Sequence, residues 1–151
     1  MSLASAARRL VACLLAWGSC EATAQSKPGD CPQARLTQSA PPEDLMKRNP
    51  LLGNSAAASA GRARFQGNAD TDGCSLCHGK KGDGKGKLAK LYDPPPRNFT
   101  CAATMNAIPD GQLFWAIRHG ITASGMPPHR DLTDTEVWQL VLAVRELATS
   151  R

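Results

Sequence analysis

The sequence predicts an all-α fold built around one small core. Apolar residues recur every three or four positions near the C-terminus, at Val137, Leu140, Val141, Val144 and Leu147, which is the period of a helix. No convincing strand or hairpin signal accompanies them. The chain has 151 residues, of which 5% are aromatic. It is therefore long enough for one domain and has little apolar material for its core.

Three helices are expected in chain order. Alanine-rich residues favour a first helix that begins near Ser55 and stops at Gly67. A second, over residues 110–119, places Leu113, Phe114 and Ile117 on one side and stops at Gly120. The third begins at Thr133-Asp134-Thr135-Glu136, which has the pattern of a capping box.

Residues 1–24 have the pattern of a cleaved secretory signal. Arg8-Arg9 precede a short apolar run, and Ala22-Thr23-Ala24 forms an A-x-A cleavage site before Gln25. The run is far shorter than the roughly 20 residues that span a bilayer, so no membrane span is predicted. We expect export to a bacterial periplasm. Twin-arginine export and lipid attachment at Cys13 or Cys20 are the alternatives.

The segment after the signal, residues 25–55, is expected to be an irregular arm. It contains five prolines, with no sustained period between them. We expect this arm to lie over the main domain, which covers residues 56–151.

Cys74-Ser75-Leu76-Cys77-His78 is the most specific motif, because C-x-x-C-H is the attachment sequence of a c-type haem. On a helical turn, Cys74, Cys77 and His78 project from one face. Both thiols then reach one porphyrin while the imidazole reaches its iron. A thioredoxin-like pair would need a βαβ pattern, and a tetrahedral zinc site would need four ligands; the sequence offers neither. The motif predicts one covalently bound haem c.

Cysteine usage leaves one further pair. Two cysteines fall in the signal and two hold the haem, so Cys31 and Cys101 remain. In an oxidising compartment such a pair is expected to form a disulfide, and a closed loop of about 70 residues contributes on the order of 4 kcal/mol. Two free buried thiols are the alternative.

The sixth coordination position of the iron needs its own explanation. Besides water, the candidates are Met46, Met105, Met126, His119 and His129. Met126 stands out because a glycine precedes it and two prolines follow it, which predicts a short extended loop. A thioether suits haem iron, and His/Met ligation raises the reduction potential into the range useful for electron transfer. The alternative is that Met126 merely fills a gap.

The order of these motifs resembles that of the small bacterial class I c-type cytochromes. Within residues 56–149 the matching residues are Gly61 and Phe65, Cys74 to Gly79, Leu113 to Ile121, Met126-Pro127 and Leu132 to Val141. The resemblance implies the class I cytochrome c fold, in which helices pack around one covalently bound haem. The first and last helices are expected to cross beside it, through Gly61 and Phe65 against Trp138.

The same resemblance implies that His78 and Met126 are the axial ligands of the iron. In this family a proline carbonyl accepts the N–H of the proximal imidazole, and Pro94, Pro95 or Pro96 is expected to supply it here. Arg97 and Asn98 are candidates for hydrogen bonds to a haem propionate, with a solvated arginine as the alternative. We expect His119 and His129 to be structural or surface residues, and Trp115 and Trp138 to be core.

These observations predict a periplasmic one-electron carrier and not an enzyme, with no catalytic residue and no small-molecule substrate at the iron. Partners are expected to be redox proteins with an acidic face, steered by the lysine cluster Lys80, Lys81, Lys85, Lys87 and Lys90. The formal net charge is +5, yet export and the lack of interleaved aromatics argue against nucleic acid. The alternatives are an electron-transfer subunit of a periplasmic dehydrogenase complex, or a haem enzyme or gas sensor with a displaceable sixth ligand.

Overall fold

The computed structural model describes residues 27–33, 37–68 and 73–149. The predicted signal at 1–24 lies outside the described residues. The described part is helical, with no strand beyond an isolated bridge between Ile121 and Met126, which confirms the all-α prediction. Its elements are α1 (Pro42–Leu45), α2 (Ser55–Gln66), α3 (Ser75–His78), η1 (Ala89–Leu91), α4 (Ala102–Met105), α5 (Asp110–His119), η2 (Thr122–Ser124) and α6 (Asp134–Thr149).

The three predicted helices are confirmed as α2, α5 and α6. Gly67 and Gly120 follow α2 and α5 with φ of 71° and 72°, the left-handed region that favours glycine at a helix end. Thr133 begins α6 as the capping box requires, because its N–H donates to the Glu136 carboxylate at 2.7 Å. The sequence did not predict α1 and α4, because one-turn helices are too short to show a period.

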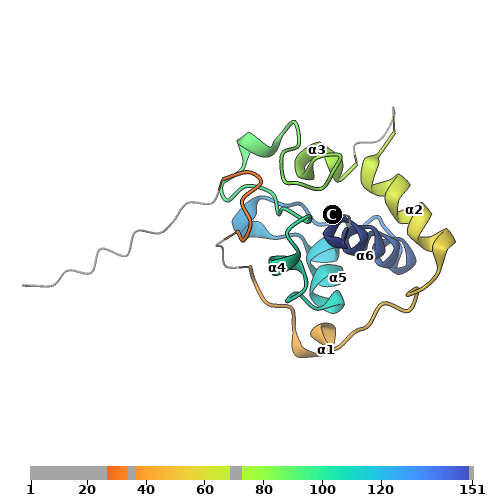
Figure 1. Cartoon of the computed structure of the whole chain (residues 1–151). Helices are drawn as coiled ribbons and strands as arrows, with labels where there is room; N and C mark the ends of the chain where they lie inside the picture. Colours follow the sequence, from red (N-terminus) through yellow and green to blue (C-terminus); the bar gives the residue numbers. More distant parts are fainter. Residues whose placement is uncertain (1–26, 34–36, 69–72, 150–151) are drawn as a thin grey trace, which may run out of the picture.

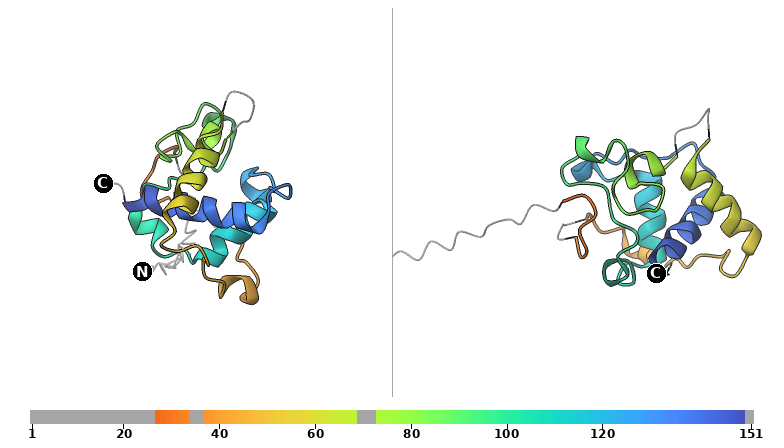
Figure 2. Two further views of the ribbon diagram at one scale, coloured as in Figure 1. Left: turned by 90° about the vertical axis from the view of Figure 1, so that its right-hand side faces the viewer. Right: turned by 45° about the horizontal axis from the view of Figure 1, so that its top comes forward.

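The centre of the fold is the crossing of α2 and α6 (Figure 2). A Cβ on Gly61 would overlap the backbone carbonyl of Gln139, so only glycine allows the two helices to approach this closely. Phe65 is 2% exposed and joins the main core cluster, which also contains Trp138. The Trp138 ring packs on Phe114, with centroids 4.4 Å apart. The predicted crossing is therefore confirmed, and Gln139 rather than Trp138 meets Gly61.

The arm runs along the outside of the helical domain, and its short helix α1 packs against α5 (Figure 1). The backbone N–H of Ala40 donates to the Gln112 side chain at 2.8 Å, and Asn49 Nδ2 donates to the Trp138 carbonyl at 2.9 Å. Cys31 of the arm also forms a disulfide with Cys101 in this structure, and their Cα atoms are 5.4 Å apart. The described parts of the arm are thus attached to the main domain at several points. No described helix is long and apolar enough to cross a membrane.

Candidate functional site

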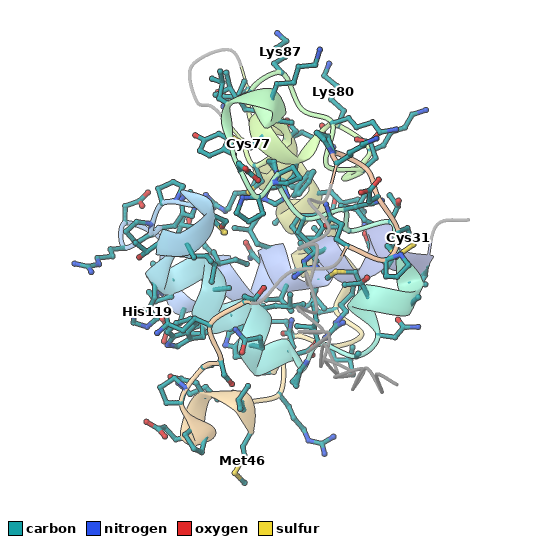
Figure 3. The ribbon with its side chains drawn as sticks, turned by 90° about the vertical axis from the view of Figure 1, so that its left-hand side faces the viewer. Cys31, Met46, Cys77, Lys80, Lys87 and His119 are labelled. Carbon is teal, nitrogen blue, oxygen red and sulfur yellow. A yellow bond between two sulfur atoms is a disulfide. The ribbon has the colours of Figure 1, made fainter. Side chains whose placement is uncertain are left out.

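The residues of the C-x-x-C-H motif lie on one short turn, α3. In Figure 3, Lys80 and Lys87 of the lysine cluster lie above Cys77 of this turn. The N–H of His78 donates to the Cys74 carbonyl at 2.9 Å, which closes the turn. The glycine-rich loop then folds back. Gly84 and Gly86 donate to the carbonyls of His78 and Cys77 at 2.8 and 3.1 Å. The backbone carbonyls at the C-terminal end of α3 therefore accept hydrogen bonds from the residues that follow the helix.

The imidazole of His78 is buried and held on two sides. Its Nδ1 lies 2.9 Å from the Arg97 carbonyl oxygen. A carbonyl only accepts, so Nδ1 carries the proton, and Nε2 is the nitrogen whose lone pair is available to a metal. The Phe99 ring stacks on the imidazole with centroids 4.4 Å apart, and Phe65 packs edge-on against Phe99 at 6.1 Å. No sequence signal pointed to Phe99 as part of this site.

The acceptor for His78 corrects the sequence prediction, which assigned this role to one of three prolines. The carbonyl that accepts belongs to Arg97, the residue after them. The Pro96 carbonyl instead accepts from Gln33 of the arm at 3.1 Å. The N–H of Phe99 donates to the Gly82 carbonyl at 2.7 Å, which holds this segment beside the loop after the motif and brings Arg97 opposite the histidine.

The two thiols and the imidazole share one face of the turn. Burial raises the pKa of the Cys74 thiol to about 11, so this sulfur is a neutral thiol at neutral pH. Among the described residues, no group of three or more His, Cys, Asp or Glu side chains is placed to hold a metal ion. Two thiols and an imidazole on one turn, with Nδ1 directed away from the ligand side, are the donor set that haem c needs. The residues present therefore fit haem c.

Met126 lies on a different element, the loop between α5 and α6. Its backbone pairs with Ile121 in both directions, at 2.9 and 3.2 Å, so residues 121–126 form a tight turn. The side chain is half-buried and packs with a small cluster of Ala40, Trp115 and Ile121. Arg118 ties down the rest of this loop, because its guanidinium donates to two loop carbonyls, at His129 and Leu132. The position of Met126 is thus well supported, and its role as an axial ligand stays a prediction.

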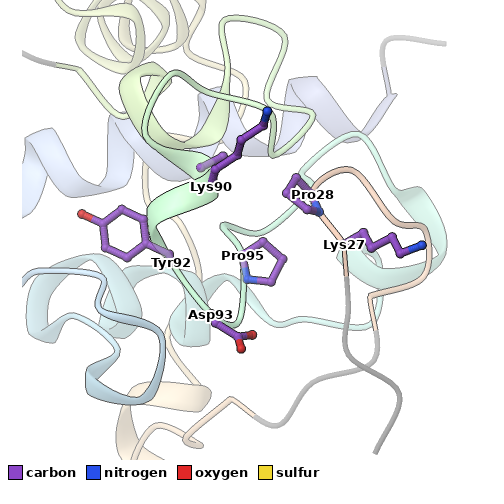
Figure 4. Close-up of a pocket in the computed structure, with 7 residues that line it drawn as sticks. Lys27, Pro28, Lys90, Tyr92, Asp93 and Pro95 are labelled. Carbon is purple, nitrogen blue, oxygen red and sulfur yellow. The ribbon is translucent and has the colours of Figure 1, made fainter.

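An open depression of about 340 Å³ lies between the arm and η1 (Figure 4). Tyr92 and Pro95 form part of its wall, with Lys27 and Lys90 at the sides. A Cβ on Gly125 would lie within 3.0 Å of the Tyr92 ring. The segment that follows the motif therefore touches the loop that carries Met126.

Arg97 and Asn98, the two candidates for propionate contacts, have different surroundings. Arg97 is 8% exposed, so the alternative of a solvated arginine is wrong. Burial lowers the pKa of its guanidinium, and no ion pair among the described residues involves it. The Asn98 side chain instead donates to the Gly29 and Asp30 carbonyls at 2.9 and 3.3 Å. Arg97 donates to Thr37 of the arm at 3.0 Å, and a guanidinium has further N–H donors for a carboxylate, whereas both of these Asn98 contacts go to carbonyls of the arm.

The remaining candidates behave as predicted. Trp115 and Trp138 are buried, and exposed His119 stacks on Trp115 with centroids 5.2 Å apart. The half-buried His129 contributes its backbone N–H to the Ile117 carbonyl at 3.1 Å. These residues support the helices and the loop around the site.

Comparisons with known proteins concern the fold and the family of this chain. A comparison with curated protein sequences gives no significant match. Among solved structures, the chain is similar to one from a reducing HAO-like protein complex of Kuenenia stuttgartiensis, with a TM-score of 0.54 and 20% sequence identity. The similarity covers 77% of this chain and 50% of that one, so this chain spans about half the length of its structural relative. At this identity the likeness shows the fold alone.

The family comparison is decisive. The family model described as "Cytochrome C oxidase, cbb3-type, subunit III" matches residues 56–142. These residues include α3, α5, the loop with Met126 and all of α2 except its first residue. A match over more than half of the chain, joined to a helical fold and a C-x-x-C-H turn, establishes a haem-binding electron-transfer protein: the chain belongs to this family of cytochrome c domains.

Proposed function

We propose that this protein is a periplasmic one-electron carrier with a single haem c, attached through Cys74 and Cys77 and ligated by His78 and Met126. The observation that carries the proposal is the 2.9 Å contact between His78 Nδ1 and the Arg97 carbonyl. It presents Nε2 as a metal ligand on the same turn as the two thiols. When bound, haem c supplies one-electron chemistry through its iron.

The chain's own residues then bind, orient and shield the group. Cys74 and Cys77 are the attachment points, and the buried ring contacts of His78 keep the imidazole in one orientation. Met126 offers a soft thioether from a constrained loop. The buried guanidinium of Arg97 would pair with a propionate, because an opposite charge offsets the cost of its burial.

Location and redox state are part of the same proposal. Export through the predicted signal places the chain in an oxidising compartment. The bond between Cys31 and Cys101 is the form expected there, and it attaches the arm to the segment just before α4.

Removing the thioether tests the ligand assignment. In Met126→Ala, the weak red band of methionine-to-ferric-iron charge transfer should vanish from the optical spectrum of the oxidised protein. Met46→Ala is the matched control, because Met46 is 81% exposed on the arm; this variant should keep the band. Absence of the band from the unmutated protein at neutral pH would show that Met126 is not the ligand.

The lysine cluster supports a partner with an acidic face. All five of its lysines are exposed, and Lys80 and Lys87 extend outward above Cys77 (Figure 3). Charges this close to the attachment site steer an oppositely charged protein toward it. We expect electron exchange to slow as salt rises. At low salt it should be slower in Lys87→Gln than in Lys47→Gln, whose lysine follows Met46 at the opposite end of the molecule (Figure 3). A rate that does not depend on salt would contradict steering.

A second candidate is an electron-transfer subunit of a larger periplasmic dehydrogenase assembly. The solved structure similar to this chain belongs to a protein complex, and that observation favours the alternative. Stable co-purification with a larger redox subunit would support it, whereas a monomeric holoprotein supports the free carrier. Carbon monoxide binding distinguishes the free carrier and the complex subunit from a haem enzyme or gas sensor, because an iron ligated by Met126 should not bind carbon monoxide.

A further inference from the structure

The N-terminal arm holds the very residue whose carbonyl faces the proximal histidine. Gln33, which is 6% exposed, donates from Nε2 to the Pro96 carbonyl at 3.1 Å. Its Oε1 accepts from the Asn98 N–H at 2.8 Å. Pro96 and Asn98 are the two neighbours of Arg97 in the chain. One glutamine amide therefore brackets Arg97, and the carbonyl between its two hydrogen bonds accepts from His78.

The arm also holds Arg97 through its side chain. Arg97 Nη2 donates to Thr37 Oγ1 at 3.0 Å. Gln33, Pro96, Arg97, Asn98 and His78 are all buried, so water competes little with these hydrogen bonds. Movement of the arm would therefore directly displace the Arg97 carbonyl.

We propose that Gln33 is a positioning residue for the proximal histidine, and that the arm thereby lowers the reduction potential of the haem. The proposal rests on the proposed role of His78 as an axial ligand. A fixed acceptor at Nδ1–H makes the other ring nitrogen a more basic ligand, and a more basic ligand favours the ferric state. The family match begins at residue 56, so this control comes from outside the matched residues.

The chain contains a matched control for Gln33. Gln112 of α5 also makes two hydrogen bonds between the arm and the domain. It accepts from the Ala40 N–H at 2.8 Å and donates to the Gln38 carbonyl at 3.1 Å. Gln33→Met and Gln112→Met thus each remove two hydrogen bonds that anchor the arm. Only the first releases the peptide units on either side of Arg97.

The decisive measurement is an optical redox titration of the haem-loaded variants. Gln33→Met should raise the midpoint potential, with a shift of roughly threefold to tenfold in the equilibrium constant against a fixed mediator, where tenfold corresponds to about 59 mV for one electron. Gln112→Met should leave the potential unchanged. Amide hydrogen exchange gives a second readout: the Asn98 N–H should exchange faster in Gln33→Met and keep its protection in Gln112→Met. If Gln33→Met does not accumulate, Gln33→Asn, whose shorter side chain cannot span both partners, should show the same shifts.

An unchanged potential in the Gln33 variant, or equal shifts in both variants, would overturn the proposal. A fall in potential would overturn it too, because that is the sign expected if the variant only admits water to the haem. If the proposed function itself is wrong, the result is different: the unmutated protein would carry no haem that remains attached after the chain is denatured.

Discussion

Gly61→Ala tests the helix crossing on which the fold depends. In an exposed helix this change stabilises by about 1 kcal/mol, the difference in helix propensity. Here the new Cβ would overlap the Gln139 carbonyl of α6. Because the obstacle is backbone, the helices must separate, which loosens the contacts of Phe65 and Val141, 2% and 0% exposed. Overpacking costs up to about 3 kcal/mol, so we expect a net loss of roughly 2 kcal/mol in the free energy of unfolding.

The assay is urea unfolding of the haem-loaded protein, followed by helical circular dichroism. Ser59→Ala is the matched control, because Ser59 lies exposed on the same helix and its change should stay within about 0.5 kcal/mol. A Gly61→Ala protein as stable as the parent would refute the reasoning, because it would show that α2 and α6 do not approach this closely.

Three further predictions concern the arm, the methionine loop and acid stability. Replacing Cys31 and Cys101 together by serine should lower the free energy of unfolding in urea by on the order of 4 kcal/mol, because the bond closes a loop of 70 residues; an equally stable variant would argue against the disulfide. Arg118→Gln should free the loop around Met126, so that added imidazole, titrated optically, binds the iron roughly tenfold more tightly; unchanged affinity would mean that Arg118 does not restrain the ligand. The pKa of Glu136 lies below its usual value of 4.5, chiefly because the carboxylate accepts the backbone N–H that begins α6. Its contribution to stability is present above that value and lost as pH falls through the lower folded pKa. Glu136→Gln should therefore flatten the acid limb of stability against pH, and a limb of unchanged slope would contradict this.

Local sequence determined the helices and the attachment turn. Gly67 and Gly120 follow α2 and α5 as predicted, and α6 begins after the predicted capping box, because capping and helical period act within a few residues. The C-x-x-C-H turn is equally local, since thioether attachment needs two thiols and an imidazole on one face. Gly61 and Phe65 were assigned to the crossing through the family resemblance, and the tertiary structure added that Gly61 meets the backbone of Gln139.

Tertiary structure alone decided which groups surround His78. Three prolines precede Arg97, and nothing local distinguishes their carbonyls from its own. The acceptor is the carbonyl that faces the imidazole after the chain has folded over 19 residues. Gln33 reaches the same segment across 63 residues, and so turns an arm that looked irregular into part of the histidine's support. Such contacts depend on the directions of backbone groups in distant segments, which are set only when those segments pack together.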